Sequence, residues 1–385
     1  MANKKSSSGF SLKDHLFNCE RVEYLSNLFT AADAQFAGQG FVRETLEGFQ
    51  SLELKQRIVK IATTLEHYLP TDFKLAAKLI VSALPPPLDP TRQDDDFGDF
   101  IFAPLGAYVV RQGAEKRQLQ LSLKTLKQLT MRFSMEDAIR HFINLYPEET
   151  LQELGKWASD RNYHVRRLVS EGTRPLLPWS GRLSLPVEKP LPLLDVLHAD
   201  PTRYVTRSVA NHLNDIAKSH PELVIETLQR WQSVGKQRSD ELHWMTRHAL
   251  RTLVKQGHPP AIKHLGFSAN PKITVNQFAL AQSQTRPGEA IEFSFEVIAR
   301  QDTQLLLDYI IEFVKADGRT APKVFKLKQV LLRSNQSLKI VKRHPLRANA
   351  TTFSLYPGTH RLKLQINGSV FGELSFEMLL SDQPL

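Results

Sequence analysis

The chain of 385 residues has a single cysteine, Cys19. One thiol cannot form a disulfide within the chain, and it cannot build a cysteine-based zinc site there. The sequence also lacks a continuous apolar run of about 18 residues, which argues against a membrane-spanning helix. The N-terminal MANKKSSSGF is not followed by an apolar stretch with a small-residue cleavage site, so we expect no export signal. These absences predict a protein of the reducing cytoplasm.

Signatures of common catalytic machinery are missing as well. The sequence contains no glycine-rich phosphate loop, no helix motif with paired histidines and no nucleophile elbow. Their absence argues against ATP-driven and zinc-driven chemistry.

Positive charge, in contrast, is in excess. The chain has 50 lysines and arginines against 40 aspartates and glutamates, a formal net charge of +10. A chain with this balance is attracted to polyanions, and its association is sensitive to salt. Charge alone leaves DNA, RNA and an acidic membrane surface open as partners. A length of 385 residues also exceeds the size at which one hydrophobic core keeps growing, which favours two domains.

Apolar residues recur at helical spacing through about residue 265. Three segments align at intervals of forty residues and begin at Asp160, Asp200 and Asp240. This period is typical of HEAT-type helix pairs, which stack into a superhelix with an extended concave groove. We therefore predict an all-α HEAT-like repeat superhelix over residues 10–268, preceded by a disordered N-terminus over residues 1–9.

Local signals divide this region further. Ser134 with Asp137 three residues later matches a capping box at a helix start. Residues 175–192 contain five prolines and no helical pattern, which predicts an irregular connection. Residues 85–105, with three consecutive prolines and the acidic residues 94–96, predict another.

After Pro271 the apolar pattern changes to a period of two, which is typical of strands. The expected strands are residues 273–282, 290–299, 305–315, 324–332, 338–343, 351–356, 360–368 and 373–379. Eight short strands in about 110 residues predict an all-β immunoglobulin-like sandwich over residues 272–385, without the disulfide.

Residues 318–372, within the predicted sandwich, contain no aspartate or glutamate. A basic segment of this kind is a candidate for phosphate binding, although a solvated basic face without a partner is the alternative. The candidate contacts in it are Lys323, Lys326, Lys339, Lys342 and Arg343.

Basic residues also recur on one class of repeat helix. Arg167, Arg207 and Arg247 occupy one equivalent position of the forty-residue repeat. They either contact a polyanion in the groove or pair with acids between layers of the stack. The other candidate contacts on this class of helix are Arg166, Arg203 and Lys218.

Three carboxylates stand out against this basic background. Glu171 ends a helix, where it opposes the helix dipole and needs compensation, for which the adjacent Arg174 is suited. Asp215 lies two turns past Arg207, and its alternative is an exposed helix acid. Glu136 lies in a first helical turn, where an acid also favours the dipole.

The segments EGTRPLLPW, residues 171–179, and RSVANHLNDIAK, residues 207–218, resemble the AlkC branch of the HEAT-like-repeat alkylpurine DNA glycosylases. The resemblance extends over about residues 10–265. Some members of this branch also carry a C-terminal immunoglobulin-like domain, which residues 272–385 would supply.

The resemblance implies hydrolysis of the N-glycosidic bond of cationic alkylated bases, such as 3-methyladenine and 3-methylcytosine, in duplex DNA without base flipping. No metal or organic cofactor is implied. A cationic base is already a good leaving group, so the enzyme has to stabilise the sugar cation and position water, as carboxylates can. The matching motifs assign that role to Glu171, Asp215 and Glu136, and they place Trp179 against the sugar or backbone of the damaged nucleotide.

Tyr163 and Arg174 are assigned DNA contact or support of the catalytic groups. The expected partner is duplex DNA that contains alkylated bases, with no membrane partner, and the expected state is a monomer that associates with the nucleoid when bound. The alternative to a glycosylase is a non-catalytic HEAT-repeat scaffold that binds nucleic acid or protein. Both predict DNA binding that depends on salt.

Overall fold

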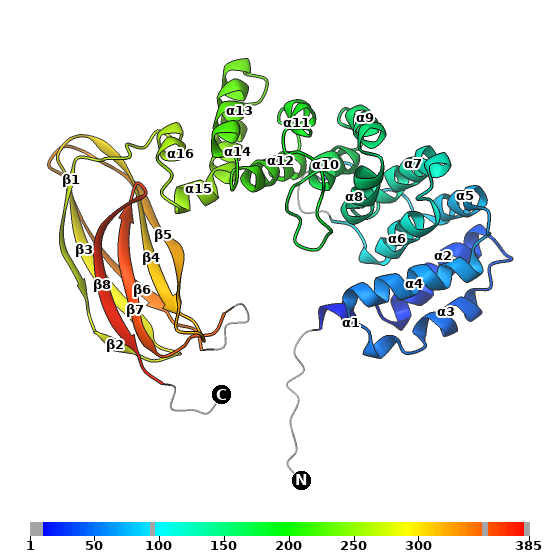
Figure 1. The fold of residues 1–385 in the computed structure, drawn as a ribbon, viewed down its shortest axis with the longest axis horizontal. Coiled ribbons are helices and arrows are strands. Elements are labelled where there is room, and N and C mark those ends of the chain that lie inside the picture. Colours follow the sequence, from blue (N-terminus) through cyan, green and yellow to red (C-terminus); the bar gives the residue numbers. More distant parts are fainter. Residues whose placement is uncertain (1–10, 93–96, 349–352, 381–385) are drawn as a thin grey trace, which may run out of the picture. The chain divides into compact units, whose positions relative to one another are not determined.

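A computed structural model describes residues 11–92, 97–348 and 353–380 (Figure 1). Helices occupy the chain through His264 and strands follow from Ile273, so the prediction of an all-α region before an all-β region is confirmed. The predicted disordered residues 1–9 and the acidic residues 94–96 lie outside the described residues. In the described ranges, no helix combines the length and hydropathy that a membrane span requires.

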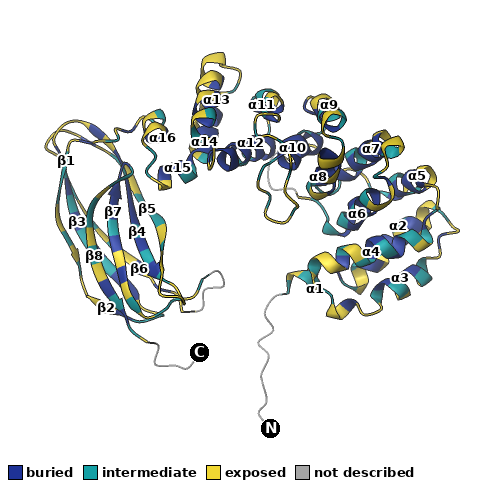
Figure 2. Cartoon of the chain, viewed as in Figure 1, coloured by how far each residue is buried: buried dark blue, intermediate teal, exposed yellow. Residues whose placement is uncertain are grey.

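The helices of the first region are α1 (Leu12–Leu16), α2 (Cys19–Ala32), α3 (Gly38–Leu46), η1 (Phe49–Ser51), α4 (Leu54–Tyr68), α5 (Phe73–Ala83), η2 (Phe100–Phe102), α6 (Ala103–Gln112), η3 (Lys116–Gln118), α7 (Leu119–Thr130), α8 (Glu136–Leu145), α9 (Pro147–Trp157), α10 (Tyr163–Gly172), α11 (Leu191–Leu197), α12 (Arg203–Ile216), α13 (Pro221–Val234), α14 (Ser239–Ala249), α15 (Arg251–Lys255) and α16 (Pro259–His264). The three aligned repeat segments correspond to α10, α12 and α14, each preceded by a helix of its own. Figure 2 shows that α10 and α12 are built largely from buried residues.

Ion pairs connect successive layers of the repeats. Lys127 of α7 lies 2.6 Å from Asp160, which precedes α10. Arg166 of α10 donates to Asp200, which precedes α12, with Nη2 to Oδ1 at 3.1 Å. Arg203 of α12 donates from Nε to Glu241 of α14 at 2.9 Å. Arg166 and Arg203, which the sequence offered as contacts to a polyanion, therefore pair with acids between layers.

The predicted capping box at Ser134 is wrong. Met135 is the N-cap of α8, and it makes no side-chain capping bond. The Ser134 hydroxyl instead donates to the Glu136 carboxylate and accepts a hydrogen bond of 2.6 Å from Arg167. The Ser134 hydroxyl thus bonds to Glu136 and to Arg167 of α10 and does not cap the backbone of α8. Sequence spacing does not show that an arginine of another helix binds this hydroxyl.

The two predicted connections are shorter than expected, and the residues of them that the structure describes are irregular. The second ends at Pro190, since α11 begins at Leu191 and tolerates Pro192 in its first turn. The first ends at Asp99, whose side chain accepts from the backbone N–H of Ile101 and caps η2. Helix α6 follows directly.

The second region is a sandwich of β1 (Ile273–Leu280), β2 (Gln284–Thr285), β3 (Ala290–Ala299), β4 (Thr303–Val314), β5 (Thr320–Leu332), β6 (Ser337–Pro345), β7 (Gly358–Ile366) and β8 (Ser369–Met378). One sheet has the order β1-β3-β6 and the other the order β2-β8-β7-β4-β5. Pairing is antiparallel except between β2 and β8. Alternate side chains of β3 and β4, among them Phe293, Phe295 and Tyr309, form the core.

One predicted strand, at residues 351–356, has no counterpart in the described part of the chain. Residues 353–356 of the expected strand at 351–356 have no strand conformation, and residues 351–352 lie outside the described part of the chain. Both edges of the following strand, β7, are already paired with β4 and β8, so the preceding segment finds no free edge there. The short strand β2, which sequence periodicity did not indicate, pairs with β8 instead.

Candidate active site

Glu171 lies in the last turn of α10 and is only 5% exposed. Arg174, just beyond the helix, donates from Nη1 to Glu171 Oε1 at 2.6 Å. Ser208 of α12 donates to the other oxygen, Oε2, at 2.6 Å. The expected compensation of this C-terminal acid by Arg174 is therefore present, and both carboxylate oxygens are held in place.

Asp215 is also buried, at 5% exposure, on the last turn of α12. The same Arg174 donates to Asp215 Oδ2 from Nε at 2.9 Å and lies 2.8 Å from it at Nη2. Asp215 is therefore not an exposed helix acid, the alternative that the sequence left open. Arg174 bridges two carboxylates from neighbouring repeats.

Glu136 joins the same group through Arg167. Arg167 Nη1 donates to Glu136 Oε2 at 2.7 Å, and its Nη2 lies 3.5 Å from Glu171 Oε2. The side chain of Glu136 is 28% exposed, against 6% for Glu171 and 4% for Asp215. The three predicted carboxylates thus form one row that alternates with two arginines, and Glu136 is its most accessible member.

Charge within the row is stabilised mutually. Burial by itself would raise the pKa of Glu171, but Arg167, Arg174 and the Ser208 hydrogen bond outweigh it, so that this pKa is lowered. Burial likewise opposes the charge of Arg167, while Glu171 and Glu136 raise its pKa. We call Glu136, Arg167, Glu171, Arg174 and Asp215 the carboxylate–arginine row. A preorganised array of this kind stabilises positive charge that develops beside it.

Neutral and aromatic groups surround the row. His212 of α12 is fully buried, and burial, reinforced by nearby Arg174, lowers its pKa to about 3, so the ring is neutral. The Arg167 guanidinium lies over the ring of Tyr204, 4.8 Å from its centroid, and over Phe97 at 5.7 Å. These neighbours restrict water around the row and fix Arg167.

Trp179, another of the predicted site residues, is strongly exposed. It lies in the connection after α10 and is 70% exposed, although tryptophan usually buries its ring. Its backbone carbonyl accepts a hydrogen bond from Lys55. Trp179 lies eight positions after Glu171 and five after Arg174, so the connection that carries it starts beside these two residues.

The remaining predicted contacts of the repeats differ in exposure. Tyr163 is buried, with its hydroxyl directed at the carbonyl of Asp89 at 3.4 Å. Arg207 is half-buried, and Arg247 and Lys218 are exposed. At the equivalent position of the repeat, Arg167 is therefore buried in an ion pair, whereas Arg247 lies at the surface.

Sequence reasoning missed Ser208 and Arg140. Ser208 orients Glu171, and its position on the face of α12 that meets α10 appears only in three dimensions. Arg140 of α8 is 2% exposed and donates to carbonyls of the segment that carries Arg174 and Trp179. The only sequence signal for it is an arginine on the apolar face of a helix, a buried position that normally requires partners.

The basic segment of the sandwich is less one-sided in space than in sequence. In the β3–β6 register, Lys339 lies opposite Glu296, and Arg343 lies opposite Glu292. Lys326 of β5 lies opposite Asp308 of β4. Lys323 has the apolar Ile311 opposite it, and its ammonium lies 4.4 Å from the ring centroid of Phe353. Neighbouring strands therefore supply acids that the linear segment lacks.

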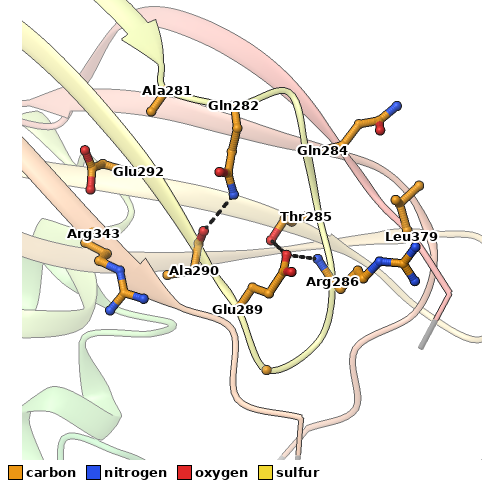
Figure 3. A pocket seen from close by; sticks show the side chains of 11 residues that line it. Ala281, Gln282, Gln284, Thr285, Arg286, Glu289, Ala290, Glu292, Arg343 and Leu379 are labelled. Atoms are coloured by element: carbon orange, nitrogen blue, oxygen red, sulfur yellow. Dashed lines mark hydrogen bonds between the residues drawn. The ribbon is translucent and has the colours of Figure 1, made fainter. Parts of the chain in front are cut away.

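A hollow on the sandwich lies beside β2 and the start of β3 (Figure 3). Glu289 there accepts from the Thr285 hydroxyl at 3.3 Å and from the Arg286 N–H at 2.8 Å. Gln282 donates to the carbonyl of Ala290. These bonds hold the turn between β2 and β3 together, so the polar groups of the hollow have a structural role.

A helical-repeat domain with a carboxylate–arginine row, followed by an immunoglobulin-like sandwich, defines the class of this protein. The family described as "Uncharacterised protein YhaZ, C-terminal Ig-like domain" matches residues 274–380. Over 336 residues the chain is 32% identical to the uncharacterized protein YhaZ of Bacillus subtilis (strain 168), with 86% of this chain and 89% of YhaZ covered.

A solved structure matches nearly the whole chain. It is the Pseudomonas fluorescens alkylpurine DNA glycosylase AlkC, bound to DNA containing an abasic site analog, with a TM-score of 0.86 and 33% identity. The match covers 96% of this chain and 100% of AlkC. The chain therefore belongs to the AlkC family, as the two motifs in its repeats indicated, and the predicted fold class is confirmed.

Proposed function

We propose that this protein is a DNA repair glycosylase that hydrolyses the N-glycosidic bond of cationic alkylated bases, such as 3-methyladenine and 3-methylcytosine, in duplex DNA. The observation that carries the proposal is the meeting of three carboxylates and two arginines, of which Glu171 and Arg174 lie shortly before the exposed Trp179 in the sequence. Membership of the AlkC family supports it, since AlkC acts on alkylpurines in DNA.

The chemistry proposed for the row follows from its charge. An alkylated base that already carries a positive charge leaves without protonation, and the sugar becomes an oxocarbenium-like cation. Asp215 and Glu171, held by Arg174 at 2.8 and 2.6 Å, are fixed before substrate arrives and cost little reorganisation. We assign the attacking water to Glu136, because its side chain is the most accessible of the three carboxylates. No metal or organic cofactor enters this scheme.

We further propose that the damaged base stays in the duplex. Trp179, with most of its ring exposed, would lie against the sugar or backbone of the damaged nucleotide. Arg207, Lys218, Arg247 and the basic residues of the sandwich would contact phosphates, whereas Arg166 and Arg203 serve mainly between layers. The domain limits proposed for this division of labour are residues 10–268 and 272–385, in a monomeric protein.

The decisive experiment measures release of free 3-methyladenine and 3-methylcytosine from methylated duplex DNA. Wild-type protein should release base, and Asp215→Asn should slow release about 10²- to 10³-fold, as expected when a preorganised charge beside the reacting centre is lost. Asp195→Asn is the matched control, because Asp195 is an aspartate paired with Arg230 on the helical repeats outside the row. It should release base at the wild-type rate. DNA binding without base release by wild type would instead support a non-catalytic scaffold.

A further inference from the structure

Among the residues that the structure describes, Arg140 of α8 donates its hydrogen bonds to backbone carbonyls alone. Its Nη1 donates to Gly172 at 3.3 Å and to Arg174 at 2.6 Å. Its Nε and Nη2 donate to Gly181 at 2.9 and 2.7 Å. One guanidinium therefore joins the end of α10 to a residue two positions beyond Trp179.

The connection after α10, to which Arg140 donates these hydrogen bonds, has no buried apolar core. None of residues 175–189, all of which the structure describes, is buried. Buried apolar packing within the connection therefore does not fix Trp179, and its place depends on the hydrogen bond from Lys55 to its carbonyl and on the hydrogen bonds at the two ends of the connection. Asn144, one turn further along α8, adds two more: its Nδ2 donates to the carbonyl of Arg182 at 3.0 Å, and its Oδ1 accepts from the Ser184 N–H at 3.0 Å.

The position of Arg140 is chemically costly. Its side chain is buried, and within the described ranges no carboxylate forms an ion pair with it, so burial lowers its pKa. Gly172 permits the close approach that the contact requires, because an added Cβ would lie 2.5 Å from Ile139 Cγ2 of α8. A buried arginine that holds only main-chain carbonyls sets the path of a segment.

We propose that Arg140 is a positioning residue that holds Trp179 and the Arg174 guanidinium in a fixed place relative to Glu171 and Asp215. The expected effect on base release rests on the proposed function, whereas the anchoring of the loop is tested independently of that function. Arg140 does not touch the carboxylates. It acts by closing residues 174–181 into a loop whose two ends cannot move apart.

The first arm of the test measures the order of the loop. Arg140→Lys retains the positive charge but cannot reach three carbonyls in a fork. Hydrogen–deuterium exchange of the amides at residues 175–184 should become at least about 10-fold faster in this variant, and the accessibility of Trp179 to acrylamide, obtained by difference with Trp179→Phe, should change.

Arg132→Lys is the matched control. Arg132 follows α7 and is half-buried, and it also donates to backbone carbonyls, from Nε to Pro85 at 2.8 Å and from Nη1 to Gln128 at 3.0 Å. It should lower thermal stability by a comparable amount and leave the exchange of residues 175–184 unchanged. Wild-type exchange of those residues in Arg140→Lys, or equal acceleration in the control, would overturn the anchoring role.

The second arm measures single-turnover base release from methylated duplex DNA and affinity for undamaged duplex. Arg140→Lys should lower the release rate about 10- to 100-fold, as a small misplacement of catalytic groups does, with affinity for undamaged DNA within about 3-fold. An unchanged release rate with a loosened loop would overturn the positioning role alone. If wild-type protein releases no base, the proposed function fails, while the first arm still decides whether Arg140 anchors the loop.

Discussion

The two regions of the molecule treat a buried carboxylate in opposite ways. In the repeats, Glu171 and Asp215 share Arg174, and the pKa of Glu171 is lowered despite its burial. In the sandwich, Asp308 of β4 is 3% exposed, and its Oδ1 has no hydrogen-bond partner among the described residues. Burial raises the pKa of Asp308 to about 6, against the opposing effect of Lys326 and Lys255.

The two regions differ in where their charged side chains lie and in what these side chains do. Ion pairs buried in the repeats fix the geometry of a site, because each partner determines the position of the next. Cations of the sandwich lie mostly on exposed strand faces, where pairing with cross-strand acids is weak and screened by salt. The buried ion pairs of the repeats therefore hold side chains in defined positions. The exposed cations of the sandwich are suited to attraction of a polyanion.

The largest expected change in stability comes from replacing Arg174, which bonds two carboxylates of the row. Arg174→Met would remove the cation that bonds both Glu171 and Asp215 and would leave Arg167 as the cation of the row beside Glu171, and we expect a loss of about 3–5 kcal/mol in the free energy of unfolding. Urea denaturation would measure it. The matched variant in the sandwich is Arg343→Met on an exposed strand face, which should change stability by less than about 0.5 kcal/mol. Equal losses in the two variants would remove the distinction between the regions.

A second prediction concerns pH and Asp308. The pKa of Asp308 in the folded state, about 6, exceeds the ordinary value of 3.8, so the native state binds the proton more tightly than the unfolded state does. Asp308 therefore destabilises the native state progressively as pH rises from about 4 to 6, by a total on the order of 2–3 kcal/mol. Asp308→Asn should be more stable than wild type at pH 7 and similar to it at pH 4. Unfolding curves that differ equally at both pH values would contradict the assigned titration.

The smallest effect is expected at four lysines of the sandwich, of which Lys342 is half-buried and the others are exposed. Replacing Lys323, Lys326, Lys339 and Lys342 together by glutamine should weaken binding to duplex DNA at low salt. It should reduce the slope of log affinity against log salt by about 0.9 for each lysine that contacts a phosphate. Single-turnover base release at saturating protein should stay at the wild-type rate. Unchanged affinity at low salt would show that these lysines form a solvated face without a DNA role.

Sequence patterns anticipated much of the site but not its connectivity. The position of Glu171 against the helix dipole correctly indicated a need for Arg174, because both residues lie in one local segment. Asp215 was ambiguous, since its burial depends on the contact between α10 and α12. Arg140 was missed because its partners lie 32 to 41 residues away and are main-chain carbonyls that carry no side-chain signature.

The sequence by itself determined the order of a helical-repeat region and a sandwich and the forty-residue period of the repeats, because a linear pattern records local periodicity. The three candidate carboxylates were indicated by motifs that resemble those of the AlkC branch. Only the tertiary structure decided that Arg167 and Arg174 join the carboxylates into one row, and that Glu292 and Glu296 lie beside the cations of β6. Helix packing and strand register bring together residues far apart in the chain, and charge counted along the sequence does not show which charges meet.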